Sequence, residues 1–251
     1  MSLSRSLCTG DIDSLARFLS GNRLPRETLC RELDQEDIYV WMGLFDRIDG
    51  ELIAVHRGMD FGGVLLLKGV TVASNRKGST AALQVALAIT ENARKSGRKG
   101  VAVWVEPSKP ERHLAARLRI PATGPLVHRY QLPIGGIGAE SNRPTDLRSS
   151  GMFSLRLGED PLVPNLLPSE AFDRINWVLD NQRLLLSTNP CNHASQLPEL
   201  LRTLAPLAQS VGARALEIHF PASDLISAVA VLSNGAKRLS RTPVRLGVRY
   251  F

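Results

Sequence analysis

The sequence is poor in cysteine and in aromatic residues, which make up 5% of it. Its three cysteines, Cys8, Cys30 and Cys191, are far apart and odd in number. This argues against a disulfide framework, and it argues equally against a metal-binding knuckle, which needs closely spaced cysteines. We therefore expect three free thiols and no metal site.

Long apolar runs are also missing. No stretch approaches the roughly 20 consecutive apolar residues that a membrane-spanning helix needs. The N-terminal sequence MSLSRSLCTGD lacks the apolar core of a signal peptide. We therefore expect a cytoplasmic protein with no membrane partner.

The charge is unbalanced toward the basic side, with 31 Lys and Arg against 24 Asp and Glu and a formal net charge of +7. Such a charge suits an anionic partner, whether a nucleotide, a nucleic acid or an acidic surface. The basic residues are scattered, however, and no basic strand interleaved with aromatic residues and no known nucleic-acid motif is found. We favour a solvated basic surface over a nucleic-acid interface.

The chain has 251 residues, 43% of them hydrophobic, which is enough for one large domain or two of ordinary size. Residues 133–150 (PIGGIGAESNRPTDLRSS) are rich in glycine and polar residues and show no periodicity. This composition is typical of a linker. We predict a first domain over residues 1–133, a linker over 134–150 and a second domain over 151–251.

In the first half, two apolar segments flank a long helical pattern. Residues 64–73 (VLLLKGVTVA) predict a strand that is interrupted by Lys68 and Gly69, and residues 101–105 (VAVWV) predict a strand buried on both faces. Residues 82–93 between them keep an apolar helical face. A glycine inside an apolar strand often marks a bulge or the close approach of another backbone.

A basic turn, residues 75–80 (NRKGST), precedes this helix. The backbone N–H groups at a helix N-terminus carry a partial positive charge and attract anions. Arg76 and Lys77 add two cations, and Gly78 lets a ligand approach the backbone without meeting a Cβ atom. The turn therefore predicts a binding site for an anion.

Other segments complete an alternating pattern of strands and helices. The first half adds a hairpin over residues 38–57, a helix over 108–119 and a strand over 126–132. The second half predicts strands over 152–157, 183–188, 215–220 and 244–251 and helices over 169–181, 197–211 and 224–232.

The two halves repeat one order of elements when Gly97 is placed on Gly212: helix, glycine, strand, turn, helix and strand. In this frame the basic turn falls on residues 190–195 (PCNHAS), which contain neither a glycine nor a Lys or Arg. We therefore expect the second half to be a degenerate copy that has lost the anion site.

The interrupted strand, the basic turn and the following helix together resemble the GNAT acyltransferases, which take acyl groups from acyl-coenzyme A. The resemblance covers residues 11–132, is strongest over 66–118, and recurs weakly in the second half, as in tandem-GNAT proteins. It implies two tandem α/β units, each a mixed, mostly antiparallel sheet flanked by helices.

The resemblance also implies a coenzyme site in the first unit. The family's pyrophosphate loop, Gln/Arg-x-x-Gly-x-Gly/Ala, falls on residues 75–80, where Gly78 alone matches. The family's bulged strand offers its main chain to pantetheine, while the Lys68 side chain either lines the cleft or extends to solvent at an edge. The implied coenzyme-binding residues are Lys68, Gly69, Val70, Arg76, Lys77, Gly78, Ser79, Thr80 and Ala81.

The catalytic residues stay unassigned. Many family members place a proton-donating tyrosine on the helix after the next strand, where this chain has Ala116, and the interrupted strand carries no carboxylate. The remaining candidates for proton transfer are His56, Asp60 and His113, each of which is more simply a surface or hydrogen-bonded polar residue. Cys191 and His193 are close in sequence, but a nucleophilic pair needs spatial geometry.

The resemblance implies an acyl-CoA-dependent acyltransferase that moves an acetyl group from acetyl-CoA to an amine on a small molecule or a protein. The absent tyrosine and carboxylate leave a second hypothesis open, a CoA-binding or ligand-sensing protein without transferase activity. A homodimer is also left open. The three tryptophans, Trp41, Trp104 and Trp177, are expected in the core.

Overall fold

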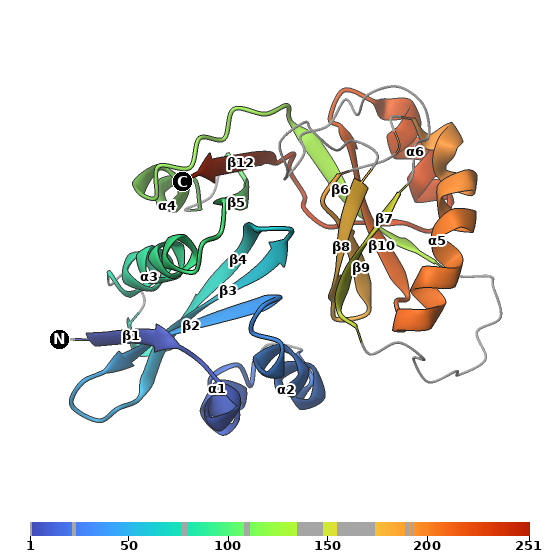
Figure 1. The fold of residues 1–251 in the computed structure, drawn as a ribbon. Helices are drawn as coiled ribbons and strands as arrows, with labels where there is room; N and C mark the ends of the chain where they lie inside the picture. The colour runs from blue at the N-terminus through green and yellow to red at the C-terminus, as the bar shows by residue number, and fades with distance from the viewer. Residues whose placement is uncertain are drawn as a thin grey trace. The chain divides into compact units, whose positions relative to one another are not determined.

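The computed structural model describes residues 2–21, 24–76, 80–107, 111–134, 148–154, 174–188, 191 and 193–251. The chain forms two compact units, each built on a six-stranded sheet (Figure 1). Unit 1 comprises residues 1–104, 109–121 and 247–251, and unit 2 comprises residues 105–108 and 122–246.

The sheet of unit 1 has the strand order β1-β2-β3-β4-β5-β12. Neighbours from β1 to β4 pair antiparallel, whereas β4 and β5 are parallel. The edge strand β1 was not predicted because its sequence, SLSRS, has no apolar pattern and is held by main-chain pairing with β2. The strands are β1 (Ser2–Ser6), β2 (Tyr39–Asp46), β3 (Leu52–Phe61), β4 (Val64–Val72), β5 (Gly100–Val105) and β12 (Arg245–Tyr250).

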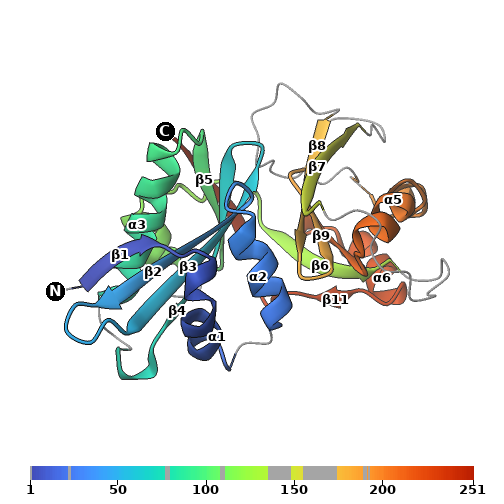
Figure 2. The same cartoon turned by 60° about the horizontal axis from the view of Figure 1, so that its bottom comes forward.

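Helices cover both faces of this sheet (Figure 2). The helix α3 (Ala81–Lys95) connects β4 to β5 and buries Val85, Ala86 and Ile89, because these positions fall on one helical face. The helices α1 (Ile12–Phe18) and α2 (Arg26–Asp34) pack together on the other side, against β3 and β2. Unit 1 also contains η1 (Thr9–Asp11), η2 (Ser74–Arg76) and α4 (Glu111–Arg117).

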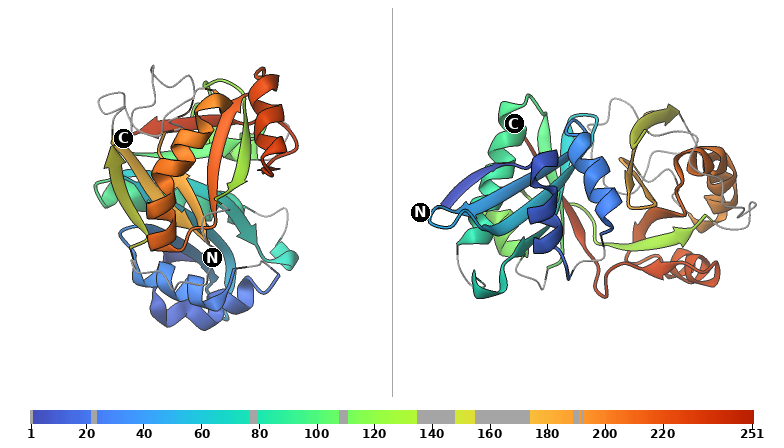
Figure 3. Two further views of the ribbon diagram at one scale, coloured as in Figure 1. Left: turned by 90° about the vertical axis from the view of Figure 1, so that its right-hand side faces the viewer. Right: turned by 90° about the horizontal axis from the view of Figure 1, so that it is seen from below.

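The sheet of unit 2 has the order β11-β6-β10-β9-β8-β7, and β9 and β10 are its parallel pair. Two helices, α5 (Leu197–Val211) and α6 (Leu225–Ser233), lie on one face of it (Figure 3). Pro206 lies inside α5 without ending the helix. The remaining elements are β6 (Val127–Pro133), β7 (Ser150–Ser154), β8 (Arg174–Asp180), β9 (Arg183–Leu186), η4 (Ala194–Gln196), β10 (Ala215–Pro221) and β11 (Lys237–Arg238).

The internal repeat is confirmed at the level of topology. In both sheets a run of antiparallel pairs, three in unit 1 and two in unit 2, leads into one parallel pair. The two strands of the parallel pair are joined by a 15-residue helix, α3 in unit 1 and α5 in unit 2. The strands predicted from the aligned glycines, β5 and β10, occupy equivalent places. The predicted fold class, two mixed and mostly antiparallel sheets flanked by helices, is confirmed.

One predicted element was wrong. Residues 169–181 were expected to form a helix, but the part of this segment that the structure describes is the strand β8. Its sequence, RINWVLD, pairs antiparallel with β7 on one side and β9 on the other. Strand pairing with β7 and β9 outweighed the local helical pattern.

The two units also differ from the predicted division at residues 133 and 151. The strand β6, which falls before the expected linker, pairs with β10 in unit 2, and the C-terminal strand β12 is the last strand of the sheet of unit 1. Each unit thus receives its last long strand from the other half of the chain. Local composition does not reveal such pairing, because the partners are separated by about 80 to 145 residues.

Candidate functional site

The interruption in β4 is a β-bulge. Two residues of β4, Lys68 and Gly69, lie opposite a single residue of β3, Arg57. A bulge leaves its extra residue outside the regular ladder and bends the strand. A Cβ atom added to Gly69 would meet no other atom within 4 Å, so the space beside the bulge is open. The bulge predicted from the Lys68-Gly69 interruption is confirmed.

The parallel ladder between β4 and β5 ends at the same point. It runs from Val64 opposite Gly100 to Leu67 opposite Val103, although β4 continues to Val72. The paired residues of β4 are buried, whereas Gly69 is exposed and the residues after it are partly exposed. In these fully described strands, the main chain of β4 beyond the bulge therefore has an edge that β5 does not pair.

His56 on β3 forms a hydrogen bond with the main chain of the bulge. Its ring is buried, and its Nε2 atom lies 2.8 Å from the Lys68 carbonyl oxygen, so Nε2 carries the proton and donates it. Its Nδ1 atom has no hydrogen-bond partner among the described residues. Burial lowers the pKa of His56 to about 4, although the Lys68 bond acts in the opposite direction. A histidine with such a pKa is a weak base near pH 7, so this geometry favours a positioning role over proton transfer.

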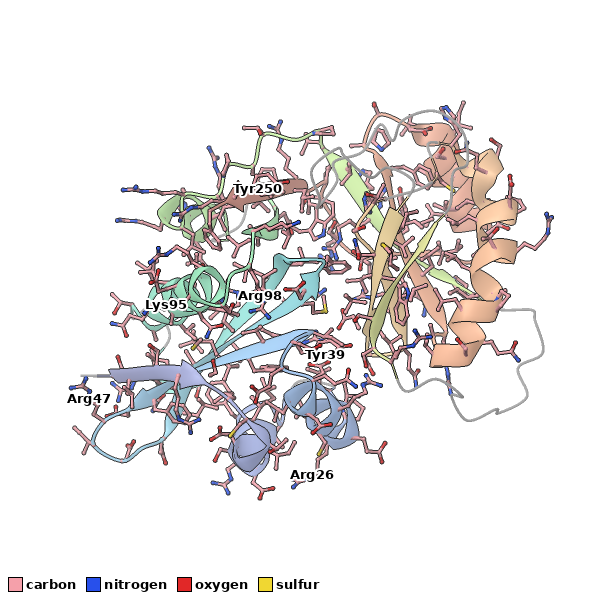
Figure 4. All side chains as sticks on the ribbon, in the orientation of Figure 1. Arg26, Tyr39, Arg47, Lys95, Arg98 and Tyr250 are labelled. Atoms are coloured by element: carbon pink, nitrogen blue, oxygen red, sulfur yellow. The ribbon has the colours of Figure 1, made fainter. Side chains whose placement is uncertain are left out.

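The other candidates for proton transfer are structural or exposed. The Asp60 carboxylate accepts from the Gly63 amide at 2.7 Å and from Arg98 Nε at 2.6 Å, and thereby closes the turn between β3 and β4. Arg98 lies close to this turn in Figure 4. His113 and Ala116 both lie exposed on α4.

A buried charged cluster lies beside the bulge, and sequence reasoning missed it. Arg57 donates from Nε to Glu32 Oε2 at 2.8 Å, and Trp41 Nε1 donates to the same oxygen at 2.9 Å. The Arg57 guanidinium also lies 5.7 Å from the ring centres of both Trp41 and Tyr39, which is labelled in Figure 4. An arginine inside an apolar strand was the available signal, but its partner is 25 residues away on α2.

The basic turn is described only at its ends. Lys77, Gly78 and Ser79 lie outside the described residues, Thr80 is the N-cap of α3, and Ala81 is its first residue. Arg76 lies in η2 at the surface, where its guanidinium is 2.6 Å from the Asp46 carboxylate. In the chain, α3 follows the C-terminal end of β4, which is the part of β4 that β5 leaves unpaired.

The sequence neighbours Cys191 and His193 do not form a nucleophilic site. Cys191 is fully buried, and burial raises the pKa of its thiol to about 12, so the reactive thiolate is not formed at neutral pH. His193 is exposed at the start of η4. All three cysteines are free thiols, as expected, with Cys8 and Cys30 exposed.

Among the described residues, no group of three or more His, Cys, Asp or Glu side chains could hold a metal ion. No helix in this part of the chain has the length and apolar character needed to cross a membrane. Trp41 and Trp177 are buried in the cores of their units, whereas Trp104 is partly exposed.

No protein-family model matches the sequence, and no curated protein matches it. Solved structures do match the fold. A putative acetyltransferase from Pyrococcus horikoshii is 13% identical, with 100% of this chain and 89% of that chain covered and a TM-score of 0.56. A tandem GNAT protein from the clavulanic acid biosynthesis pathway is 11% identical, with 100% and 98% covered and a TM-score of 0.51.

Proposed function

Because the chain has the tandem GNAT fold, we propose that it is an acyl-CoA-dependent acyltransferase whose coenzyme site lies in unit 1. The observation that carries this proposal is the bulge at Lys68 and Gly69 together with the end of the β4–β5 ladder at Leu67. An unpaired strand edge offers N–H and C=O groups to an extended ligand. The pantetheine arm of coenzyme A is extended and contains two amides, so it fits such an edge.

The pyrophosphate of the coenzyme fits the N-terminus of α3. The first N–H groups of a helix have no partner within the helix, and the helix dipole makes this end attractive to phosphate. We assign pyrophosphate binding to the amides of Gly78, Ser79, Thr80 and Ala81, with Arg76 and Lys77 balancing the charge. We assign pantetheine binding to the main chain of Lys68, Gly69 and Val70, where the absence of a side chain at Gly69 leaves room.

The proposed reaction moves an acetyl group from acetyl-CoA to an amine on a small molecule or a protein. A C–N bond forms, the thioester C–S bond breaks, and the proton lost by the amine balances the thiolate that leaves. His56 is a weak base and Asp60 is held by Arg98, so neither is assigned to this proton. Holding the amine and the thioester together supplies much of the rate in such reactions.

The second candidate is a CoA-binding or ligand-sensing protein without transferase activity. It is favoured by the alanine at position 116, where no side chain can protonate the leaving thiolate, and by the hydrogen bonds that occupy Asp60. The two candidates share the coenzyme site and differ in whether free thiol is produced.

The experiment that separates them is a thiol-release assay. The protein is incubated with acetyl-CoA and a panel of small amines and peptides with free N-termini, and free coenzyme A thiol is measured. A transferase releases thiol only when its acceptor is present and yields an acetylated amine of the matching mass. Saturable acetyl-CoA binding with no thiol release for any amine would favour the sensing protein.

A further inference from the structure

The helix α6 of unit 2 is apolar on the outside as well as on the inside. Its nine residues, LISAVAVLS, include no charged side chain. Ser227, Ala228 and Val231 are buried against unit 2. The opposite face carries four large aliphatic side chains, Leu225, Ile226, Val229 and Leu232, which are 71%, 84%, 64% and 45% exposed.

These four residues form one continuous patch, which we call the α6 face. Their spacing of one, four and seven positions from Leu225 places them on the same side of a helix. Surface helices ordinarily turn polar residues to solvent, and contiguous exposed apolar patches mark interaction surfaces. An isolated exposed residue such as Ile48, 94% exposed in the turn after β2, carries no such meaning.

The charges at the two ends of the α6 face have opposite signs. Asp224 precedes the helix and caps it by accepting from the Ser227 amide at 3.0 Å. Lys237 and Arg238 follow the helix in β11 and are exposed. The surface is therefore acidic where α6 begins and basic shortly after it ends.

This pattern is self-complementary. In a two-fold symmetric pair the same patch meets itself, and two helices crossing antiparallel bring the start of each near the end of the other. Asp224 of one copy would then face the basic residues Lys237 and Arg238 of the other. The two antiparallel helix dipoles would also attract each other. An unrelated partner would not need this arrangement of charges.

We infer that the α6 face is a homodimer interface, with a second copy of this chain packed antiparallel on it and the two-fold axis passing near Val229. A standard interface buries about 800 Å² per partner around an apolar centre with a polar rim. The four aliphatic side chains provide that centre, and the charged residues at both ends provide the rim. This inference does not depend on the proposed acyl transfer.

Sedimentation velocity of the full chain over a range of concentrations tests the inference. We expect a dimer, and we expect Ile226→Glu to raise its dissociation constant at least tenfold because the new carboxylate is buried at the contact. Ile48→Glu is the matched control, since it makes the same change at an exposed residue of unit 1 and should leave the dimer unchanged. Circular dichroism establishes that both variants are folded.

A cross-linking experiment locates the axis. In a Cys8→Ser, Cys30→Ser background, Val229→Cys should form an intermolecular disulfide on mild oxidation, because symmetry brings the two cysteines close to the roughly 5.5 Å Cα separation that a disulfide needs. Ile48→Cys should not. The inference is overturned by a wild-type monomer at every concentration, by a dimer that Ile226→Glu leaves intact, or by a Val229→Cys variant that forms no intermolecular disulfide.

Discussion

The buried pair of Glu32 and Arg57 permits a quantitative prediction for the stability of unit 1. Glu32 is fully buried, and the Arg57 side chain is 8% exposed. Arg57 and Trp41 together donate hydrogen bonds to both carboxylate oxygens. Glu32→Gln keeps the shape of the side chain but removes its charge, so that the buried guanidinium of Arg57 loses the Glu32 carboxylate.

Removing one partner of a buried ion pair typically costs about 3–5 kcal/mol, because the remaining charge stays desolvated. We expect Glu32→Gln to lower the free energy of unfolding of unit 1 by an amount in this range. A loss of about 1 kcal/mol lowers the midpoint of thermal unfolding by roughly 2–4 °C in chains of this size. The thermal midpoint of unit 1 should therefore fall by at least about 6 °C in the variant. The two units can unfold separately, so the transition of unit 1 must be resolved.

The measurement is urea unfolding of the wild type and the variant, followed by tryptophan fluorescence and circular dichroism. Glu91→Gln is the matched control, because Glu91 pairs with Arg94 on the exposed surface of α3 and its loss should not move the transition. The double variant Glu32→Leu, Arg57→Met should recover part of the stability, since it removes both charges together but takes away the acceptor of the Trp41 Nε1 hydrogen bond. A loss below about 1 kcal/mol for Glu32→Gln would refute the reasoning, because such a value is typical of an exposed pair.

Three further predictions concern His56, Asp60 and the three cysteines. The pKa of His56 is about 4 in the folded protein and about 6.5 in an unfolded chain, so the unfolded state binds the proton first and stability falls as the pH drops from 6.5 toward 4. Between pH 7 and pH 5, urea unfolding should show that the free energy of unfolding falls by about 2 kcal/mol because of His56. His219, whose pKa is also lowered to about 4 by burial, should contribute about as much. His56→Gln should remove about half of the combined loss, and an unchanged pH dependence in this variant would contradict the account. Asp60→Asn should destabilise unit 1 by about 1–3 kcal/mol in the same assay, because Arg98 loses its counter-ion, and a stability equal to wild type would show that the turn closes without it. A thiol reagent at pH 8 should modify Cys8 and Cys30 in the native protein and reach Cys191 only after denaturation, whereas three fast-reacting thiols would contradict the burial of Cys191.

The sequence predicted the features of the fold that are encoded locally. The apolar runs at β4 and β5, the helix between them and the glycine that marks the bulge lie within about 40 residues of one another, so periodicity and turn residues were sufficient. The repeat in unit 2 was predictable from the sequence because its helix and strand patterns are also encoded locally.

The features that could not be predicted from the sequence depend on contacts between separate elements, most of them far apart in the chain. The strand β8 resembled a helix locally and became a strand through pairing with β7 and β9. The strands β6 and β12 were assigned to the wrong units because their partners lie in the other half of the chain. Within the candidate site, the position of the bulge was predictable, whereas the contacts of His56 with Lys68 and of Arg57 with Glu32 required the fold.

The most direct test of the proposed coenzyme site is calorimetric titration with acetyl-CoA of the wild type, Gly78→Glu and Gly21→Glu. The two variants make the same chemical change, one in the basic turn before α3 and one in an exposed turn where an added Cβ meets nothing within 4 Å. The account predicts saturable binding with one site per chain for the wild type and Gly21→Glu, and its loss in Gly78→Glu. A folded wild type that does not bind acetyl-CoA, or a Gly78→Glu variant that binds it normally, would contradict the assignment of the coenzyme to unit 1.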